Sequence, residues 1–192
     1  MTDENVDHKR RRLLTIATSG IGLAGTAALL VPFAGSMVPS EKAKAAGAPV
    51  KVDISNLESG QQLTVEWRGK PVWIIRRSQE VLDFLPSMND RLVDPGSGMA
   101  QQPGYAQNPL RSIREEVVVL VGICTHLGCS PKYRPEFAAT AEAAFFCACH
   151  GSRFDLAGRV YKNVPAPTNL EVPPHTYLSD SEILIGSDSE AA

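Results

Sequence analysis

Four cysteines and two histidines lie in two short stretches of the sequence and could together bind a metal. The first stretch reads C-T-H-L-G-C over residues 124–129, and the second reads C-A-C-H-G-S over residues 147–152. No cysteine lies outside these two boxes, and each box places a histidine close to a cysteine. Thiolate and imidazole donors gathered in this way are typical of a metal centre.

Two kinds of metal centre fit two thiolates and two imidazoles: a tetrahedral zinc site, and a two-iron, two-sulfide cluster in which histidines replace cysteines on one iron. A Cys2His2 zinc site would leave two cysteines unused, and the sequence lacks the cysteine pairs, separated by two residues, that zinc ribbons usually carry. A covalent haem needs C-x-x-C-H, whereas residues 147–150 read C-x-C-H. These patterns disfavour a covalent haem and leave the iron-sulfur cluster and structural zinc as the alternatives.

The two boxes resemble those of the Rieske iron-sulfur proteins of quinol-cytochrome c reductases. The resemblance implies that the first cysteine and the histidine of each box bind one [2Fe-2S] cluster. These ligands are Cys124, His126, Cys147 and His150. It also implies that the remaining pair, Cys129 and Cys149, forms a disulfide, which would hold the two ligand loops together.

The resemblance also assigns roles to residues around the cluster. His150 would accept a hydrogen bond from a quinol hydroxyl, with His126 beside it, and the Ser152 hydroxyl would bond to a cluster sulfide. Leu127 would contact the quinol pocket, or only pack its own loop. The residues expected next to the cofactor are Ser152, Leu127, Gly128, Gly151, Pro165 and Pro167. The two prolines belong to a P-A-P stretch that resembles the loop covering the cluster, with a plain surface turn as the alternative.

Phe154 departs from the family pattern, because many relatives carry a tyrosine two residues after the serine. The phenol that would bond to a ligand sulfur is absent. Hydrogen bonds to the sulfurs raise the potential of such clusters, so the sequence predicts a lower potential than in tyrosine-bearing relatives.

The implied function is electron transfer in a bc1-type complex. The protein would be a subunit of a ubiquinol-cytochrome c reductase, a translocase that oxidises ubiquinol and passes one electron to cytochrome c1. Its partners would be cytochrome b and cytochrome c1 in a dimeric complex. An alternative is the Rieske small subunit of another exported oxidoreductase, such as arsenite oxidase. Rieske domains of oxygenases normally lack the disulfide pair.

The N-terminal residues predict export and a membrane anchor. Residues 1–12 are expected to form a cytoplasmic tail with a twin-arginine signal, because four consecutive cations precede an apolar run. Residues 13–38 carry no charge and exceed the length of about 20 residues that spans a bilayer. The A-x-A at residues 43–45 leaves a cleaved signal peptide as the alternative. We expect a single-pass protein of a bacterial inner membrane, with its head on the periplasmic side.

Residues 39–49 have the composition of a linker, either extended or as a short helix, and correspond to the hinge of the family. Residues 50–192 are expected to form the head, which makes the fold mainly β. It would be an antiparallel β-sandwich with a small cluster-binding subdomain at about residues 122–168. Alternating or apolar stretches predict strands, and they lie at residues 50–54, 63–67, 71–75, 117–121, 145–146, 160–161, 170–172 and 182–185.

Several details of the head follow from local signals. A turn is expected at residues 69–70, and a short helix at residues 78–85 with Ser78 as its cap. The continuous apolar run at residues 117–121 predicts a strand that is buried on both faces and leads directly into Cys124. Residues 86–111 are rich in proline and glycine and predict a long loop, which either docks on a partner or is a surface insertion without a role.

Composition narrows the range of partners. The chain of 192 residues has room for one ordinary domain plus extra segments, and its formal net charge of -2 gives no indication of a nucleic-acid partner. The two histidines outside the boxes, His8 and His175, are expected to be solvated and to have no role.

Overall fold

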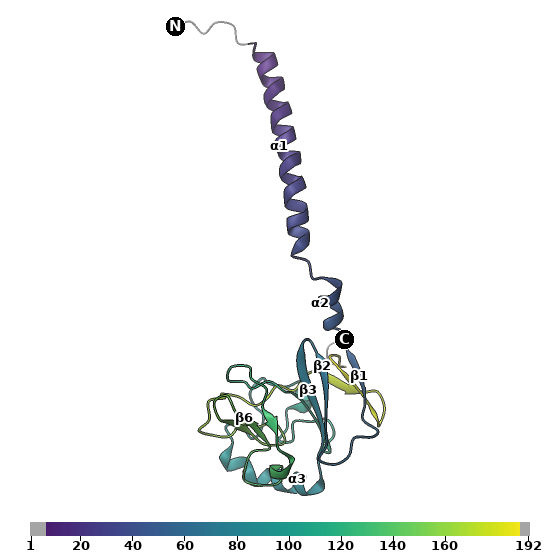
Figure 1. Cartoon of the computed structure of the whole chain (residues 1–192), viewed down its shortest axis with the longest axis vertical. Coiled ribbons are helices and arrows are strands. Elements are labelled where there is room, and N and C mark those ends of the chain that lie inside the picture. Colours follow the sequence, from purple (N-terminus) through teal and green to yellow (C-terminus); the bar gives the residue numbers. More distant parts are fainter. Residues whose placement is uncertain (1–6, 189–192) are drawn as a thin grey trace. The chain divides into compact units, whose positions relative to one another are not determined.

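The computed structural model describes residues 7–188 of the chain (Figure 1). Contacts along the chain divide it into two compact units, one ending at Ala45 and the other beginning at Ala46. The first unit is helical and the second contains the strands β1 to β9 of the described residues, so each is described by itself.

The first unit is dominated by one long helix, α1 (His8–Ser36). The side chain of Asp7 caps it by accepting hydrogen bonds from the backbone N–H groups of Lys9 and Arg10. Its 29 residues would extend over about 44 Å at 1.5 Å per residue, and the mean hydropathy of its most apolar window is 1.8. By length and composition this helix can cross a membrane, as the sequence predicts for residues 13–38.

A second, shorter helix follows in the predicted linker. The helix α2 (Glu41–Ala46) begins after Ser40, whose hydroxyl accepts a hydrogen bond from the Ala43 N–H. Of the two conformations expected for residues 39–49, the structure therefore has the short helix.

The second unit contains three antiparallel sheets of three strands each among the described residues. The first has the order β1 (Val50–Asp53), β9 (Glu182–Ile185), β8 (His175–Tyr177). The second has the order β2 (Gln62–Trp67), β3 (Lys70–Arg76), β4 (Val117–Val121). The third has the order β5 (Lys132–Tyr133), β6 (Phe145–Cys147), β7 (Ser152–Phe154). The mainly antiparallel β fold agrees with the prediction.

Strand β4 lies at the centre of the unit, because both of its faces are buried. Val117, Val119 and Val121 pack with β1 and β9 in one hydrophobic core. Val118 and Leu120 point the other way, into a second core that includes Trp73, Phe145 and Phe154. All five residues of β4 are at most 2% exposed, which confirms the predicted strand. A strand held on both sides gives the first box a rigid base.

The hairpin between β2 and β3 is displaced by one residue from its expected position. The turn falls on Arg68 and Gly69, which have φ angles of +53° and +70°, and Lys70 already begins β3. Two consecutive positive φ angles are typical of the tight hairpin turn that matches strand twist.

Residues 78–116 contain less regular structure. The helix α3 (Gln79–Phe84) is capped by the Ser78 hydroxyl, as predicted, and continues into a 3-10 segment, η1 (Leu85–Arg91). Another 3-10 turn, η2 (Gly104–Ala106), interrupts the long loop. Outside this region, a third 3-10 turn, η3 (Pro135–Phe137), follows β5.

Two predicted strands are wrong. Residues 170–172 form no strand, because their backbone groups pair with three separate segments: Leu170 N–H with Gly158 O, Glu171 O with Val121 N–H, and Val172 N–H with Gln101 O. Residues 160–161 form only isolated bridges, Phe154 with Val160 and Leu92 with Tyr161. Strand β8 begins instead at His175, after two prolines that have no N–H to donate.

Candidate metal centre

The two boxes fold into loops of the same shape. The first box leaves β4, and the Cys124 carbonyl accepts a hydrogen bond from the Gly128 N–H at 3.0 Å. The second box joins β6 to β7, and the Cys147 carbonyl accepts one from the Gly151 N–H at 2.9 Å. Both glycines have positive φ, +83° and +81°, a conformation that favours glycine. The glycines therefore shape the loops that present the predicted ligands.

Cys124 and Cys147 are free thiols, and each is 2% exposed. Burial raises the pKa of the Cys124 thiol, while hydrogen bonds from the His126 N–H and the Ser152 hydroxyl act in the opposite direction. The pocket thus already contains groups that stabilise a sulfur anion at this position.

The other two cysteines form a disulfide bond, Cys129 with Cys149, which is the pair implied by the resemblance. The sulfurs of Cys129, Cys147 and Cys149 lie within 4.8 Å of one another. They do not make a three-thiolate site, because two of them are already bonded to each other. The disulfide instead connects the two loops across 20 residues of sequence.

The two box histidines meet at the surface. Their ring centroids are 4.7 Å apart, and the ring planes are nearly perpendicular, at 86°. His126 is half-buried and His150 is exposed, while Leu127 beside them is 71% exposed. Two buried thiols and two imidazoles at the surface therefore form separate pairs, as a binuclear centre with different ligands on its two irons requires.

The loop at residues 165–168, called the proline loop, is hydrogen-bonded to both boxes. Pro165 and Pro167 are exposed, but Ala166 between them is 2% exposed, and its N–H donates to the Ser152 hydroxyl at 3.0 Å. The Thr125 hydroxyl donates to the Thr168 carbonyl at 2.7 Å. Sequence reasoning missed Thr125 as an anchor of this loop, although its position inside the first box was an available signal.

Comparison with known proteins identifies the family. Residues 49–174 match the model of the Rieske [2Fe-2S] domain, and residues 1–40 match the twin-arginine signal of ubiquinol-cytochrome c reductase iron-sulfur subunits. The chain belongs to the Rieske [2Fe-2S] family. The cofactor of this family is a [2Fe-2S] cluster, which confirms the cofactor predicted for this chain over zinc. The twin-arginine signal is confirmed as well.

Relatives are similar over nearly the whole chain. The ubiquinol-cytochrome c reductase iron-sulfur subunit of Allochromatium vinosum is 56% identical, over 100% of this chain and 95% of the relative. The subunit of the same name from Bradyrhizobium diazoefficiens is 40% identical, over 96% of this chain and 99% of the relative. A chain of a solved hyperthermophilic respiratory Complex III is 24% identical, with a TM-score of 0.49, over 88% of this chain and 98% of that one.

The donor set of this Rieske domain fits such a cluster. The four implied ligands are two free thiols and two imidazoles, and the only cysteines in the sequence besides them are consumed by the disulfide. The assignment of individual ligands remains a prediction from the resemblance.

Two buried arginines support the region behind the second box. Arg159 is 0% exposed and forms an ion pair with Asp155 at 2.8 Å, and it also donates to the carbonyls of Leu85 and Pro95. Arg111 is 0% exposed and donates to the carbonyls of residues 157 and 158. Burial lowers the pKa of Arg111 to about 10. These contacts bind the long loop at residues 86–111 to the Rieske subdomain, and sequence analysis did not detect them.

His175 was expected to be solvated, and this expectation is wrong. The side chain is 1% exposed, its Nδ1 lies 2.8 Å from the Pro173 carbonyl, and its ring packs edge-on against Tyr105. Its pKa is lowered, chiefly by burial. Its position at the start of β8, facing the core, explains the difference from the sequence expectation.

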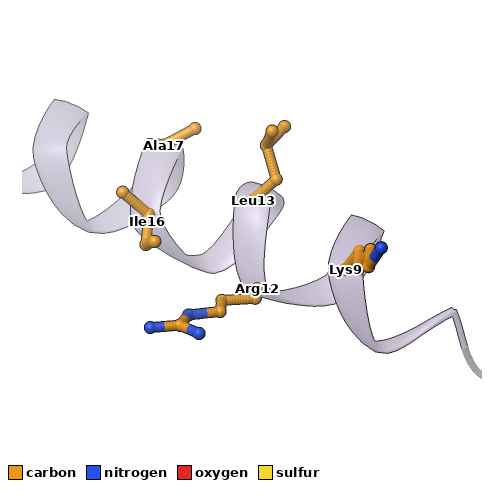
Figure 2. A pocket seen from close by; sticks show the side chains of 5 residues that line it. All are labelled: Lys9, Arg12, Leu13, Ile16 and Ala17. Atoms are coloured by element: carbon orange, nitrogen blue, oxygen red, sulfur yellow. The ribbon is translucent and has the colours of Figure 1, made fainter.

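The helix of the first unit carries one shallow hollow, lined by Lys9, Arg12, Leu13, Ile16 and Ala17 (Figure 2). All five side chains come from consecutive turns of α1, and none is a thiol, imidazole or carboxylate. The hollow is an uneven helix surface whose two cations suit the headgroup region of a membrane.

Proposed function

We propose that this protein is the Rieske electron carrier of a ubiquinol-cytochrome c reductase, and that it oxidises ubiquinol and passes one electron to cytochrome c1. One observation carries the proposal. The two boxes of a Rieske-family head contain two buried free thiols and, at the surface, two imidazoles that contact each other. The names of the relatives, which align over nearly their full lengths, support the same function.

Cys124 and Cys147 would bind one iron, and His126 and His150 would bind the other. The burial of the thiols and the exposure of His150 support this division, because the buried side would be insulated and the histidine side would meet the substrate. When bound, the cluster supplies a one-electron acceptor with a potential of about -150 to +300 mV, which quinols can reduce.

The residues of this chain bind and orient the quinol. The imidazole of His150 would accept a hydrogen bond from the quinol hydroxyl and would take up the hydroxyl proton as the quinol is oxidised. His126 lies beside it, and the exposed side chain of Leu127 offers an apolar contact for the quinone ring. Gly128 and Gly151, with their positive φ angles, shape the two loops, and Pro165 and Pro167 would form a rigid cover.

The anchor places this reaction at a membrane. We infer that residues 13–38 span the inner membrane of a bacterium, that residues 39–49 act as a hinge, and that the head works on the periplasmic side. A twin-arginine signal and a helix of sufficient length support this arrangement. Cytochrome b and cytochrome c1 would be the partner subunits, in a dimeric complex.

Electron paramagnetic resonance of membranes that contain the full-length protein tests the proposal. We expect the signal of a mixed-ligand [2Fe-2S] cluster after reduction with dithionite and also after reduction with ubiquinol, and loss of the signal in His150→Gln. The matched control is His8→Gln, which lies outside the head. Membranes that bind zinc without iron, or a signal that dithionite produces and ubiquinol does not, would overturn the proposed function.

A further inference from the structure

The outer face of the sheet formed by β5, β6 and β7 is rich in cations. In the register of this sheet, Lys132 lies opposite Phe146, and Phe146 lies opposite Arg153. Directly opposed residues share a face, so these three side chains form a row. The alternate row contains Phe145 and Phe154, which are completely buried in the core. The row of Lys132, Phe146 and Arg153 is thus the outer face of the sheet, and Lys132 and Arg153 are both exposed.

Further cations extend this row on both sides. The Arg134 guanidinium lies 5.2 Å from the ring centroid of Phe146, and the Arg153 guanidinium lies 5.8 Å from that of Tyr161. Beyond Tyr161, the Lys162 N–H donates to the Arg91 carbonyl at 2.8 Å, which places these two residues side by side. We call the five cations the cationic band. It consists of Lys132, Arg134, Arg153, Arg91 and Lys162.

The band brings together five cations that have no carboxylate partner among the described residues, a property shared with the exposed Arg68 and with the cations at residues 9–12 and 42. Elsewhere in the described part of the chain, Lys44, Lys51, Lys70 and Arg114 each form an ion pair with an acidic side chain. No band residue does so among residues 7–188, although Asp90, Glu136 and Glu142 are exposed in neighbouring segments. The Lys162 ammonium bonds only to a backbone carbonyl, that of Asp90. The band was not evident from the sequence. The net charge of the chain is -2, and the members of the band come from three separate segments.

The composition of the band is that of a protein-docking surface. Arginine is enriched among the residues that dominate binding energy, and a guanidinium that lies over an aromatic ring is held ready for a carboxylate. An unpaired positive surface also attracts a negative partner and speeds its approach. The strands that carry the band end at Cys147 and begin at Ser152, so the band moves with the second box.

We propose that the cationic band docks an acidic surface of the protein that accepts the electron from this head. The inference rests on the proposed electron-carrier function, since a protein that takes an electron from the site must approach this subdomain. The band orients the head so that the box histidines face the acceptor, while the acceptor's carboxylates pair with cations that have no carboxylate partner among residues 7–188.

Electron transfer within the intact, purified complex tests the band directly. The variant Arg91→Gln/Arg153→Gln/Lys162→Gln removes three charges, and the matched control Lys51→Gln/Arg68→Gln/Lys70→Gln removes three exposed charges from β1 and the β2–β3 hairpin. We expect about a tenfold slower reduction of the acceptor haem at low ionic strength in the band variant, with a weaker dependence on salt. The control should keep the wild-type rate. Equal rates in both variants, whether unchanged or reduced, would overturn the proposal.

Zero-length cross-linking with a carbodiimide provides a readout that needs no electron transfer. It joins lysine amines to carboxylates, so Lys162 and Lys132 should link to an acidic peptide of the acceptor, and Arg153→Lys should add a third link. Cross-linking only to another protein would contradict the proposal. So would a band variant that loses binding to anionic phospholipid vesicles while its electron transfer stays normal. If the cluster signal itself is absent, the proposed function fails, but the cross-links remain interpretable.

Discussion

The Ser152 hydroxyl accepts a hydrogen bond from the Ala166 N–H at 3.0 Å, and so joins the second box to the proline loop. The same hydroxyl acts to lower the pKa of the Cys124 thiol in the first box, against the effect of burial. Ser152 is 0% exposed, so water cannot replace it as a partner for either group. One small side chain therefore interacts with all three segments that surround the site.

The variant Ser152→Ala should lower both the free energy of unfolding and the midpoint potential of the cluster. The buried Ala166 N–H would lose its acceptor, which costs about 1–3 kcal/mol of unfolding free energy. The midpoint potential should fall, because hydrogen bonds stabilise the more negative, reduced state. Denaturant unfolding and redox titration measure the two effects. Ser130→Ala, at an exposed serine next to the first box, is the control and should leave both unchanged. A wild-type potential in Ser152→Ala would contradict the assignment.

Phe154→Tyr should raise the midpoint potential. Phe154 is completely buried on the inner face of β7, where a phenol would lie in the same core as Cys124 and Cys147. Leaving a buried hydroxyl without a hydrogen-bond acceptor costs free energy, so the phenol should donate to a ligand sulfur. This hydrogen bond would stabilise the reduced cluster. Phe146→Tyr is the matched control on the outer face of the neighbouring strand, and it should not change the potential. Redox titration that finds the same midpoint in Phe154→Tyr and wild type would refute the prediction.

The double variant Cys129→Ser/Cys149→Ser should unfold more easily. A cross-link that closes a loop of this length stabilises a fold by about 3 kcal/mol, largely by restricting the unfolded chain. The two ligand loops should also separate more readily, so the cluster signal should decay faster on storage. Unfolding with and without a thiol reductant is the internal control, since the reductant should destabilise wild type only. Equal stability of the oxidised wild type and the variant would show that the bond is structurally neutral.

The sequence predicted the parts of the fold that depend on local pattern. The apolar run at residues 117–121 identified a strand buried on both faces, and the serine before residue 79 marked the start of α3. The boxes predicted the metal ligands in the same way, because each box has its cysteines and its histidine within a few residues of one another. Both boxes come together because strands on either side of them share one core.

Long-range polar contacts escaped prediction. Arg111 bonds to residues 46 and 47 positions away, and Arg159 to a carbonyl 74 positions away, and no local periodicity marks such partners. Residues 170–172 looked like a strand because they alternate, yet their backbone groups pair with three different segments. In each case the deciding partner is distant in sequence.

Arg159→Met should destabilise the head strongly. It would leave the buried Asp155 carboxylate without its cation and the Leu85 carbonyl without its donor. Removing one partner of a buried ion pair costs about 3–5 kcal/mol. Arg153→Met is the control on the neighbouring surface, and its unfolding free energy should change by no more than about 0.5 kcal/mol. Thermal unfolding of both variants measures the difference. A small effect in Arg159→Met would mean that the loop at residues 86–111 is held by other contacts.

His175 should make the stability of the head depend on pH. Its pKa in the folded state lies below the usual value of about 6.5, because burial outweighs the opposing effects of the Pro173 carbonyl and Asp188. Tyr105 also faces the ring. Below about pH 6.5 the unfolded chain therefore binds a proton that the folded protein does not, so stability is complete above this pH and falls as the pH drops towards the folded pKa. Urea unfolding of the full-length protein in detergent between pH 8 and pH 5 should show this slope, and His175→Gln should reduce it. His8→Gln should keep the wild-type slope, and an undiminished slope in His175→Gln would assign the pH dependence to other groups.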